Sequence, residues 1–124
     1  MINDKPLDST DALEALRAAL RQFAADRDWS QFHTPKNLAT ALTVEVAELL
    51  EHFQWLREGS SAELGPDRLA DVRQELADVL IYLVMLADQL DVDLLQAARY
   101  KLERNAEKYP VDKVRGTSKK YTEL

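Results

Sequence analysis

Acidic side chains at helical spacing are the residues of this 124-residue chain best suited to chemistry. Glu45, Glu48 and Glu51 follow one another at intervals of three, and Glu75 and Asp78 repeat that interval further along the chain. Residues three apart lie on the same face of an α-helix. Two such helices packed side by side bring several carboxylates together, and like charges gathered in that way need a cation. The spacing therefore predicts a metal site between two helices.

The side chains available indicate which metal such a site would hold. An all-oxygen ligand set favours a hard ion, Mg²⁺ with Mn²⁺ as its substitute, over zinc or copper. The chain has no cysteine, which excludes a thiolate zinc site. A ferritin-like di-iron centre requires Glu-x-x-His pairs. Neither His33 nor His52 has a glutamate three residues before it, so the di-iron alternative is weak.

The position of Glu45 distinguishes it from an ordinary surface charge. At about 100° per residue, Glu45 falls within the apolar stripe of its helix, Glu48 at the edge of the stripe and Glu51 outside it. The stripe consists of Leu38, Leu42, Leu49 and Leu56. A carboxylate buried without a partner costs several kcal/mol, so Glu45 requires a compensating partner. Most helical acids are solvated or paired with Lys and Arg. We interpret Glu51 as such a solvated or paired acid. For the other acids, the spacing alone does not decide between this interpretation and a metal site.

The elements that must position these acids are helices. The chain has only three glycines and four prolines, and the intervals between them are too long for strands. Start and stop signals include Thr34-Pro35, Gly59, Pro66 and Asp93. They predict helices over 10–26, 35–58, 66–90 and 93–109, followed by an extended basic tail over 111–124. Four helices joined by short connections predict an all-α, antiparallel four-helix bundle in a single domain over 1–110.

Composition excludes several classes of function. The formal net charge is −6, and an acidic protein repels polyanions, so nucleic-acid binding is not expected. The chain begins with neither the basic start nor the apolar run of a signal peptide, and no apolar stretch approaches the roughly 20 residues of a membrane span. We therefore expect a cytoplasmic protein without a membrane partner.

The third helix predicts self-association. Between Ala77 and Ala87 the only charged residue is Asp78, so this stretch is apolar nearly all round and should be buried on every side. Two opposite apolar sets lie on it, Ile81, Val84 and Met85 against Leu76, Val79 and Leu83. One small bundle cannot bury both sets. We expect a second copy of the chain to cover the first set, in a homo-oligomer.

The acids stand within longer motifs that resemble a known family. The segments Glu45-Val-Ala-Glu48-Leu and Glu75-Leu-Ala-Asp78-Val-Leu-Ile-Tyr82 resemble the paired metal-binding motif of the MazG-like, all-α nucleoside triphosphate pyrophosphohydrolases. Further segments are similar to the dCTP pyrophosphatase branch of that family. They are Phe23 to Trp29, Gln31-Phe-His33, Phe53-Gln-Trp55, Lys101 to Asn105 with Tyr109-Pro110, and 119–124. The likeness covers about residues 20–124.

The resemblance implies a reaction and an assignment of roles. The enzyme would cleave between the α- and β-phosphates of a nucleoside triphosphate and release pyrophosphate. Its biological role would be nucleotide-pool sanitation. Glu45, Glu48, Glu75 and Asp78 would be the Mg²⁺ ligands. Bound metal ions can neutralise a triphosphate and activate water. One carboxylate would act as general base. The resemblance does not decide whether Glu45 or Glu48 is the general base. It implies a tetramer in preference to a dimer.

The resemblance also assigns the substrate-binding residues. Trp29, Trp55 and Tyr82 would wall the nucleoside pocket, although a lone aromatic residue at helical spacing is more often part of a core. Lys101 and Asn105 share one face of the fourth helix and would hold phosphate oxygens.

Leu20 departs from the family pattern. In dCTP-preferring members a histidine stands three residues before the Phe23-Ala-Ala run, and here that position is Leu20. A strict preference for dCTP is therefore in question, because related members take dUTP, modified nucleotides or several triphosphates.

A competing interpretation is a non-catalytic helical oligomerisation module whose acids only confer solubility. A buried Glu45 opposite Glu75 and Asp78 speaks against it, because an interface gains nothing from clustered like charge.

Overall fold

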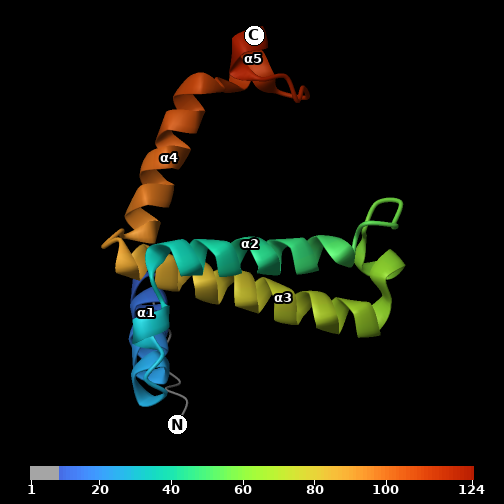
Figure 1. Ribbon diagram of the computed structural model, residues 1–124. Helices are drawn as coiled ribbons and strands as arrows, with labels where there is room; N and C mark the ends of the chain where they lie inside the picture. Colours follow the sequence, from blue (N-terminus) through green and yellow to red (C-terminus); the bar gives the residue numbers. More distant parts are fainter. Residues whose placement is uncertain (1–8) are drawn as a thin grey trace. The chain divides into compact units, whose positions relative to one another are not determined.

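The computed structural model describes residues 9–124, in which every regular element is a helix (Figure 1). The chain divides after Asp91 into two compact units. The first contains α1 (Ser9–Asp26), the 3-10 turn η1 (Ser30–Phe32), α2 (Pro35–Glu51) and α3 (Ser61–Gln89). The second contains α4 (Leu94–Lys108), α5 (Val111–Val114) and the 3-10 turn η2 (Tyr121–Glu123). The all-α prediction is confirmed. Among the described helices, none combines the length and apolarity that a membrane span requires.

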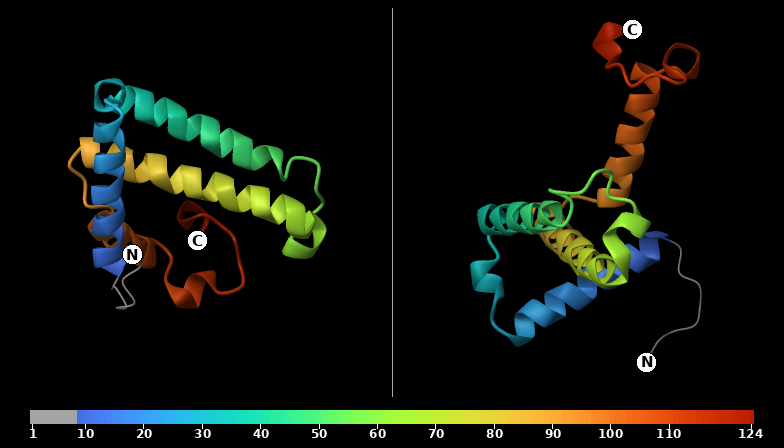
Figure 2. Two further views of the ribbon diagram at one scale, coloured as in Figure 1. Left: turned by 90° about the horizontal axis from the view of Figure 1, so that it is seen from below. Right: turned by 90° about the vertical axis from the view of Figure 1, so that its right-hand side faces the viewer.

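The first unit is built on the α2–α3 hairpin. These two helices run antiparallel and pack side by side, while α1 crosses α3 near its C-terminal end (Figure 2). The small core lies where the three helices meet. Leu38 at the start of α2 is 1% exposed, and Ala24 of α1 and Val84 and Ala87 of α3 are also buried. This arrangement places the acids of α2 beside those of α3.

The start of α2 is confirmed, but its predicted end is wrong. The side chain of Thr34 accepts a hydrogen bond from the backbone N–H of Asn37 at 3.2 Å, and α2 then ends at Glu51 instead of residue 58. The helix ends early because three successive backbone N–H groups that follow α2 donate hydrogen bonds to the Glu63 carboxylate. These belong to Arg57, Glu58 and Gly59, at 2.5, 3.1 and 3.2 Å. No local pattern in α2 signals this distant acceptor.

The connection between α2 and α3 is held by Gly59. Its φ is +78°, and an added Cβ would lie 2.7 Å from Cδ1 of Phe53. Ser60 then caps α3 by accepting from the Glu63 N–H at 3.2 Å. One helical turn therefore precedes the predicted start at Pro66. The helix breaks at Gly65 (φ 75°, ψ 167°), so Pro66 does open its longer segment.

The second unit corrects the prediction for the tail. Asp93 caps α4 as predicted, accepting from the Gln96 N–H at 3.0 Å. The segment 111–124 was predicted to be an extended tail, but it contains the helix α5 and the 3-10 turn η2. Tyr121 packs edge-on against Tyr109, with ring centroids 6.1 Å apart, and Lys108 Nζ lies 4.9 Å from the Tyr121 ring centre. Aromatic and cation–π contacts of this kind fold the chain end back onto α4. The four-helix bundle and the domain boundary at residue 110 stay predictions.

The uncovered face of α3 differs from the predicted one. Val84 is buried and Ile81 and Met85 are half-buried, because α1 packs on that side. The large hydrophobic side chains that remain exposed on α3 are Leu76, Leu80 and Leu83.

Candidate functional site

Three carboxylates meet between α2 and α3. One oxygen each of Glu45, Glu48 and Glu75 lies within 4.8 Å of the others. Glu45 and Glu75 are half-buried, whereas Glu48 and Glu51 are exposed, as the helical stripe predicted. Glu51 lies outside the cluster. The antiparallel hairpin therefore converts two local spacings of three residues into one acidic centre.

The environment of this cluster is suited to a cation. Burial raises the pKa of Glu45 to about 7, with the carboxylates of Glu48 and Glu75 close enough to share its proton and the charges of Glu48 and Asp78 acting in the same direction. Oε2 of Glu45 and Oε2 of Glu75 are buried and accept no hydrogen bond. Buried polar atoms are normally satisfied. The ion pairs within residues 9–124 involve none of these acids, so the alternative of pairing with Lys or Arg is not realised there.

Asp78, the fourth predicted ligand, lies at the edge of the cluster. It follows Glu75 by one helical turn and is half-buried. It is outside the group of three close oxygens, and its charge contributes to the raised pKa of Glu45. Asp78 also lines a cavity beside the acids. It therefore connects the acidic centre with that cavity.

The cavity has a volume of about 380 Å³ and lies between α1, α3 and the loop that follows α1. It is lined by Ala19, Leu20, Phe23, Trp29, His33, Asp78, Ile81, Tyr82 and Met85. Mostly apolar walls with a few polar groups are typical of small-molecule sites, and the volume lies within their usual range of roughly 300–1,000 Å³. A flat aromatic ligand with an anionic tail directed at Asp78 would match this arrangement once a cation is present.

Two of the predicted aromatic residues contribute to the cavity. Trp29 packs edge-on against Phe23, with ring centroids 5.8 Å apart, and Tyr82 lines the cavity near Asp78. The Arg27 guanidinium carbon lies over the Phe23 ring, 3.7 Å from the ring centre. Trp29, Tyr82 and Asp78, predicted separately, are thus brought together by the fold.

The other predicted binding residues are carried by other elements. Trp55 is not on α2 but in the connection that follows it, and it is 87% exposed. Lys101 and Asn105 are exposed on α4, in the second unit, one helical turn apart. Their roles stay predictions.

Some cavity residues were not predicted for this role. Phe23 and His33 were named only within segments of the family resemblance, and His33 was otherwise considered only as a metal ligand. Ile81 and Met85 were predicted to face a second copy. The cavity joins segments of chain that are far apart in the sequence, so helical periodicity within one element could not reveal it. The signals in the sequence were the two segments that resemble the family, Phe23 to Trp29 and Gln31-Phe-His33.

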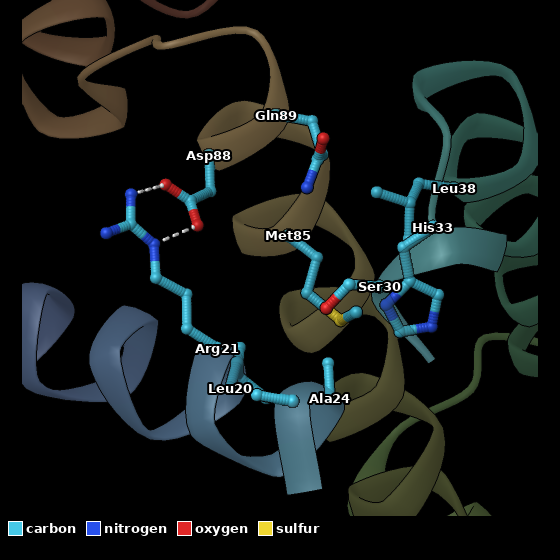
Figure 3. Close-up of a pocket in the computed structure, with 10 residues that line it drawn as sticks. Leu20, Arg21, Ala24, Ser30, His33, Leu38, Met85, Asp88 and Gln89 are labelled. Carbon is cyan, nitrogen blue, oxygen red and sulfur yellow. Dashed lines mark hydrogen bonds and ion pairs between the residues drawn. The ribbon is translucent and has the colours of Figure 1, made fainter. Parts of the chain in front are cut away.

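A second cavity, of about 300 Å³, shares Leu20, His33 and Met85 with the first (Figure 3). On its far side Asp88 of α3 accepts hydrogen bonds from Arg21 of α1, at 2.7 Å from Nε and 2.5 Å from Nη2. This hydrogen bonding by Arg21 holds the pKa of Asp88 below its usual value. The pair attaches α1, and with it Leu20, to α3.

Comparison with known proteins decides the family. The sequence matches the MazG-like family over residues 40–124. The chain belongs to the MazG-like family. Among relatives, dCTP pyrophosphatase 1 of Homo sapiens is 48% identical over 114 residues, which cover 90% of this chain and 67% of the relative. dCTP pyrophosphatase 1 of Bos taurus is 47% identical over 118 residues, covering 94% of this chain and 70% of the relative.

Solved structures agree with this assignment. A pyrophosphatase from Archaeoglobus fulgidus DSM 4304 superposes with a TM-score of 0.75 at 41% identity, covering 89% of this chain and 99% of the other. The resemblance found in the sequence is therefore confirmed. As a MazG-like protein the chain is a nucleoside triphosphate pyrophosphohydrolase, which disfavours a purely structural module.

Proposed function

We propose that this MazG-like enzyme hydrolyses dCTP, or a closely related pyrimidine nucleoside triphosphate, to the monophosphate and pyrophosphate, with Mg²⁺ as cofactor. The observation that carries the proposal is the pair of buried carboxylate oxygens of Glu45 and Glu75 that have no hydrogen-bond partner. Asp78, whose charge contributes to the raised pKa of Glu45, lines a cavity of nucleoside size. The name of the relatives, dCTP pyrophosphatase 1, supports dCTP as the first substrate to test. The biological role would be nucleotide-pool sanitation.

The residues present fit a hard divalent cation. Glu45, Glu48 and Glu75 would hold it through oxygen atoms, with Asp78 on the side facing the cavity. Mn²⁺ should substitute, because it accepts the same oxygen ligands. When bound, the cation neutralises triphosphate charge and lowers the pKa of a coordinated water.

The protein's own side chains perform the remaining steps. One carboxylate of α2, Glu45 or Glu48, accepts the proton of the attacking water. The nucleoside packs against Trp29 and Tyr82, which orients the triphosphate toward Asp78. Positioning of this kind contributes to the rate because the reacting groups no longer have to find each other.

The proposal also gives roles to three exposed residues. Lys101 and Asn105 would bind phosphate oxygens from α4. Trp55 would stack on the nucleoside, but the connections that carry Trp29 and Trp55 lie at opposite ends of α2, a helix of 17 residues (Figure 1). At 1.5 Å per residue that separation is roughly 25 Å, so the stacking Trp55 would come from another copy in a homo-oligomer.

A nucleotide panel tests the proposal. The purified protein is incubated with each of the common ribo- and deoxyribonucleoside triphosphates, with Mg²⁺, with Mn²⁺ and with chelator, and the products are separated by chromatography. We expect dCTP or another pyrimidine deoxynucleotide to be converted to its monophosphate only when a divalent cation is present. Turnover in chelator, or turnover of purine nucleotides alone, would contradict the proposal.

A further inference from the structure

We infer that Glu63 is a positioning residue whose carboxylate fixes the connection between α2 and α3, so that Trp55 is held in place before the nucleotide arrives. The inference rests on the proposed function, because it takes Trp55 to stack on a nucleoside. Figure 1 shows this connection at the end of the α2–α3 hairpin that lies away from α1. Trp55 is 87% exposed, so the core of its own unit does not hold it.

The Glu63 carboxylate binds the backbone just beyond Trp55. Its Oε1 accepts from the Arg57 N–H at 2.5 Å, and its Oε2 accepts from the N–H groups of Glu58 and Gly59 at 3.1 and 3.2 Å. Hydrogen bonds to an ionised acceptor are stronger than those between neutral groups. These bonds, first those of Glu58 and Arg57, lower the pKa of Glu63, so the carboxylate stays charged at neutral pH. One side chain therefore holds three successive residues.

Contacts on both sides of Trp55 complete the fixed connection. The Leu56 N–H donates to the Phe53 carbonyl at 3.0 Å, which places Trp55 inside a turn. The Phe53 ring packs against Gly59, where an added Cβ would lie 2.7 Å from Cδ1 of the ring. The φ of Gly59 is +78°, a conformation that glycine adopts readily. The backbone before and after Trp55 is thus held together.

The local sequence does not determine this shape by itself. The helical pattern continues to residue 58, so the interaction with Glu63, and not local propensity, ends α2 at Glu51. A binding group on an anchored segment loses less conformational entropy on binding than one on a free segment. Glu63 therefore decides whether Trp55 is presented in one position or in many.

Substitutions at Glu63 and a matched control test the inference. Glu63→Ala removes every acceptor, whereas Glu63→Gln keeps one carbonyl oxygen. Asp67→Ala is the control, because Asp67 is exposed four residues further along α3 and belongs to none of the ion pairs within residues 9–124. The measurements are amide hydrogen exchange at residues 57–59, KM and kcat for dCTP with Mg²⁺, and calorimetric binding of dCMP without metal.

We expect Glu63→Ala to speed amide exchange at residues 57–59 by roughly tenfold or more, because the N–H groups lose their acceptor. KM for dCTP should rise by roughly fivefold or more, with kcat changed by less than about threefold. Glu63→Gln should give intermediate values, and Asp67→Ala should match the wild type. Unchanged exchange in Glu63→Ala, or faster exchange with an unchanged KM, would overturn the inference.

A double-mutant cycle with Trp55→Ala distinguishes positioning from a general loosening of the fold. If Glu63 acts through Trp55, Glu63→Ala should raise KM no further once Trp55 has been replaced by alanine. Additive increases in KM would show that Glu63 does not act through Trp55.

The binding measurement separates this inference from the proposed function. If the wild-type protein releases pyrophosphate and the KM effects of the cycle are additive, the inference fails and the function stands. If no nucleotide is cleaved but Glu63→Ala and Trp55→Ala weaken dCMP binding without additivity, the function fails and the role of Glu63 stands.

Discussion

The acidic centre contains two buried carboxylate oxygens that accept no hydrogen bond from the protein. Oε2 of Glu45 and Oε2 of Glu75 are buried without a partner, and Glu48 adds a third oxygen within 4.8 Å. Such a cluster is unfavourable in the protein alone, since like charges and burial both oppose ionisation. Binding a cation offsets both effects. Function and stability are therefore opposed at these positions.

Substituting the acids should separate those two effects. We expect Glu45→Gln, Glu48→Gln, Glu75→Gln and Asp78→Asn each to lower turnover by roughly a hundredfold or more, because a metal ligand is lost. The melting temperature of the metal-free protein should stay the same or rise, because each change removes mutual repulsion. Steady-state kinetics and calorimetry are the measurements. Glu51→Gln is the matched control, being exposed and outside the cluster. Near-normal activity in all four variants would show that the acids bind no catalytic metal.

The raised pKa of Glu45 predicts a pH dependence of stability. Its folded-state pKa is about 7, above the unfolded value of roughly 4.3, so between these values the folded state binds the proton more tightly. This contribution is fully present below the unfolded pKa and is lost as the pH rises through about 7. Urea unfolding of the metal-free protein should therefore show a fall in the free energy of unfolding between pH 5 and pH 8, and Mg²⁺ should reverse it.

The Glu45→Gln variant isolates this contribution. In Glu45→Gln the free energy of unfolding should fall less between pH 5 and pH 8 than in the wild type. In Glu51→Gln it should fall as much as in the wild type. Identical pH dependence in wild type and Glu45→Gln would mean that Glu45 titrates normally in the folded protein.

At the residue scale the sequence predicted the acids better than the cavity. The interval of three residues and the position of Glu45 in the apolar stripe are properties of one helix, and both hold in the structure. Phe23 and His33 belong to a cavity that exists only after α1 has crossed α3. Their roles depend on contacts between distant segments, which periodicity does not encode.

At the element scale, α1 is fixed to α3 by Asp88. Arg21 donates two hydrogen bonds to this carboxylate, and Arg17 Nη1 lies 3.5 Å from it. Both arginines are partly exposed, while the Asp88 side chain is only 12% exposed. The attachment matters for function because α1 carries Leu20 and Phe23, which line the cavity.

We expect Asp88→Asn to destabilise the protein by about 1 kcal/mol, a modest value because the exposed arginines regain hydration. The lowered pKa of Asp88 means that its contribution is present above the unfolded pKa and is lost as the pH falls through the folded one. A double-mutant cycle of Asp88→Asn with Arg21→Gln, measured by urea unfolding at pH 7, should show coupling. Strictly additive effects would show that the pair contributes nothing.

Helix ends show which element boundaries the sequence can predict. Thr34-Pro35 and Asp93 are local caps, and α2 and α4 begin where they indicate. The end of α2 was predicted at 58 because Gly59 is a common stop signal. The actual end at Glu51 follows from Glu63 holding the backbone of the connection, an interaction from the next element along the chain.

At the scale of the whole molecule, α3 presents an apolar stripe that its own unit leaves uncovered. Leu76, Leu80 and Leu83 lie at intervals of four and three residues and are 53%, 44% and 38% exposed. Leu50 on α2 is 62% exposed. Burying such surface is worth roughly 25 cal/mol per Å², which favours the homo-oligomer that we propose.

This stripe replaces the face predicted from the sequence. A helical wheel shows that residues 77–87 of α3 are apolar nearly all round, but it does not show which side α1 will cover. We now expect Leu80→Lys or Leu83→Lys to dissociate the oligomer in sedimentation experiments and to lower activity with it. Ala15→Lys, an exposed change on α1, is the control and should affect neither. A wild-type protein that sediments as a fully active 14.1 kDa monomer would rule the oligomer out.

The most direct test of the central claim is which phosphate bond breaks. The protein is incubated with dCTP and Mg²⁺, and the products are followed by phosphorus NMR from the first turnovers. The acidic cluster beside the nucleoside cavity predicts dCMP and pyrophosphate in equal amounts, with no dCDP at any time. In Glu75→Gln the same products should form roughly a hundredfold or more slowly. Formation of dCDP and orthophosphate as the first products would contradict the account.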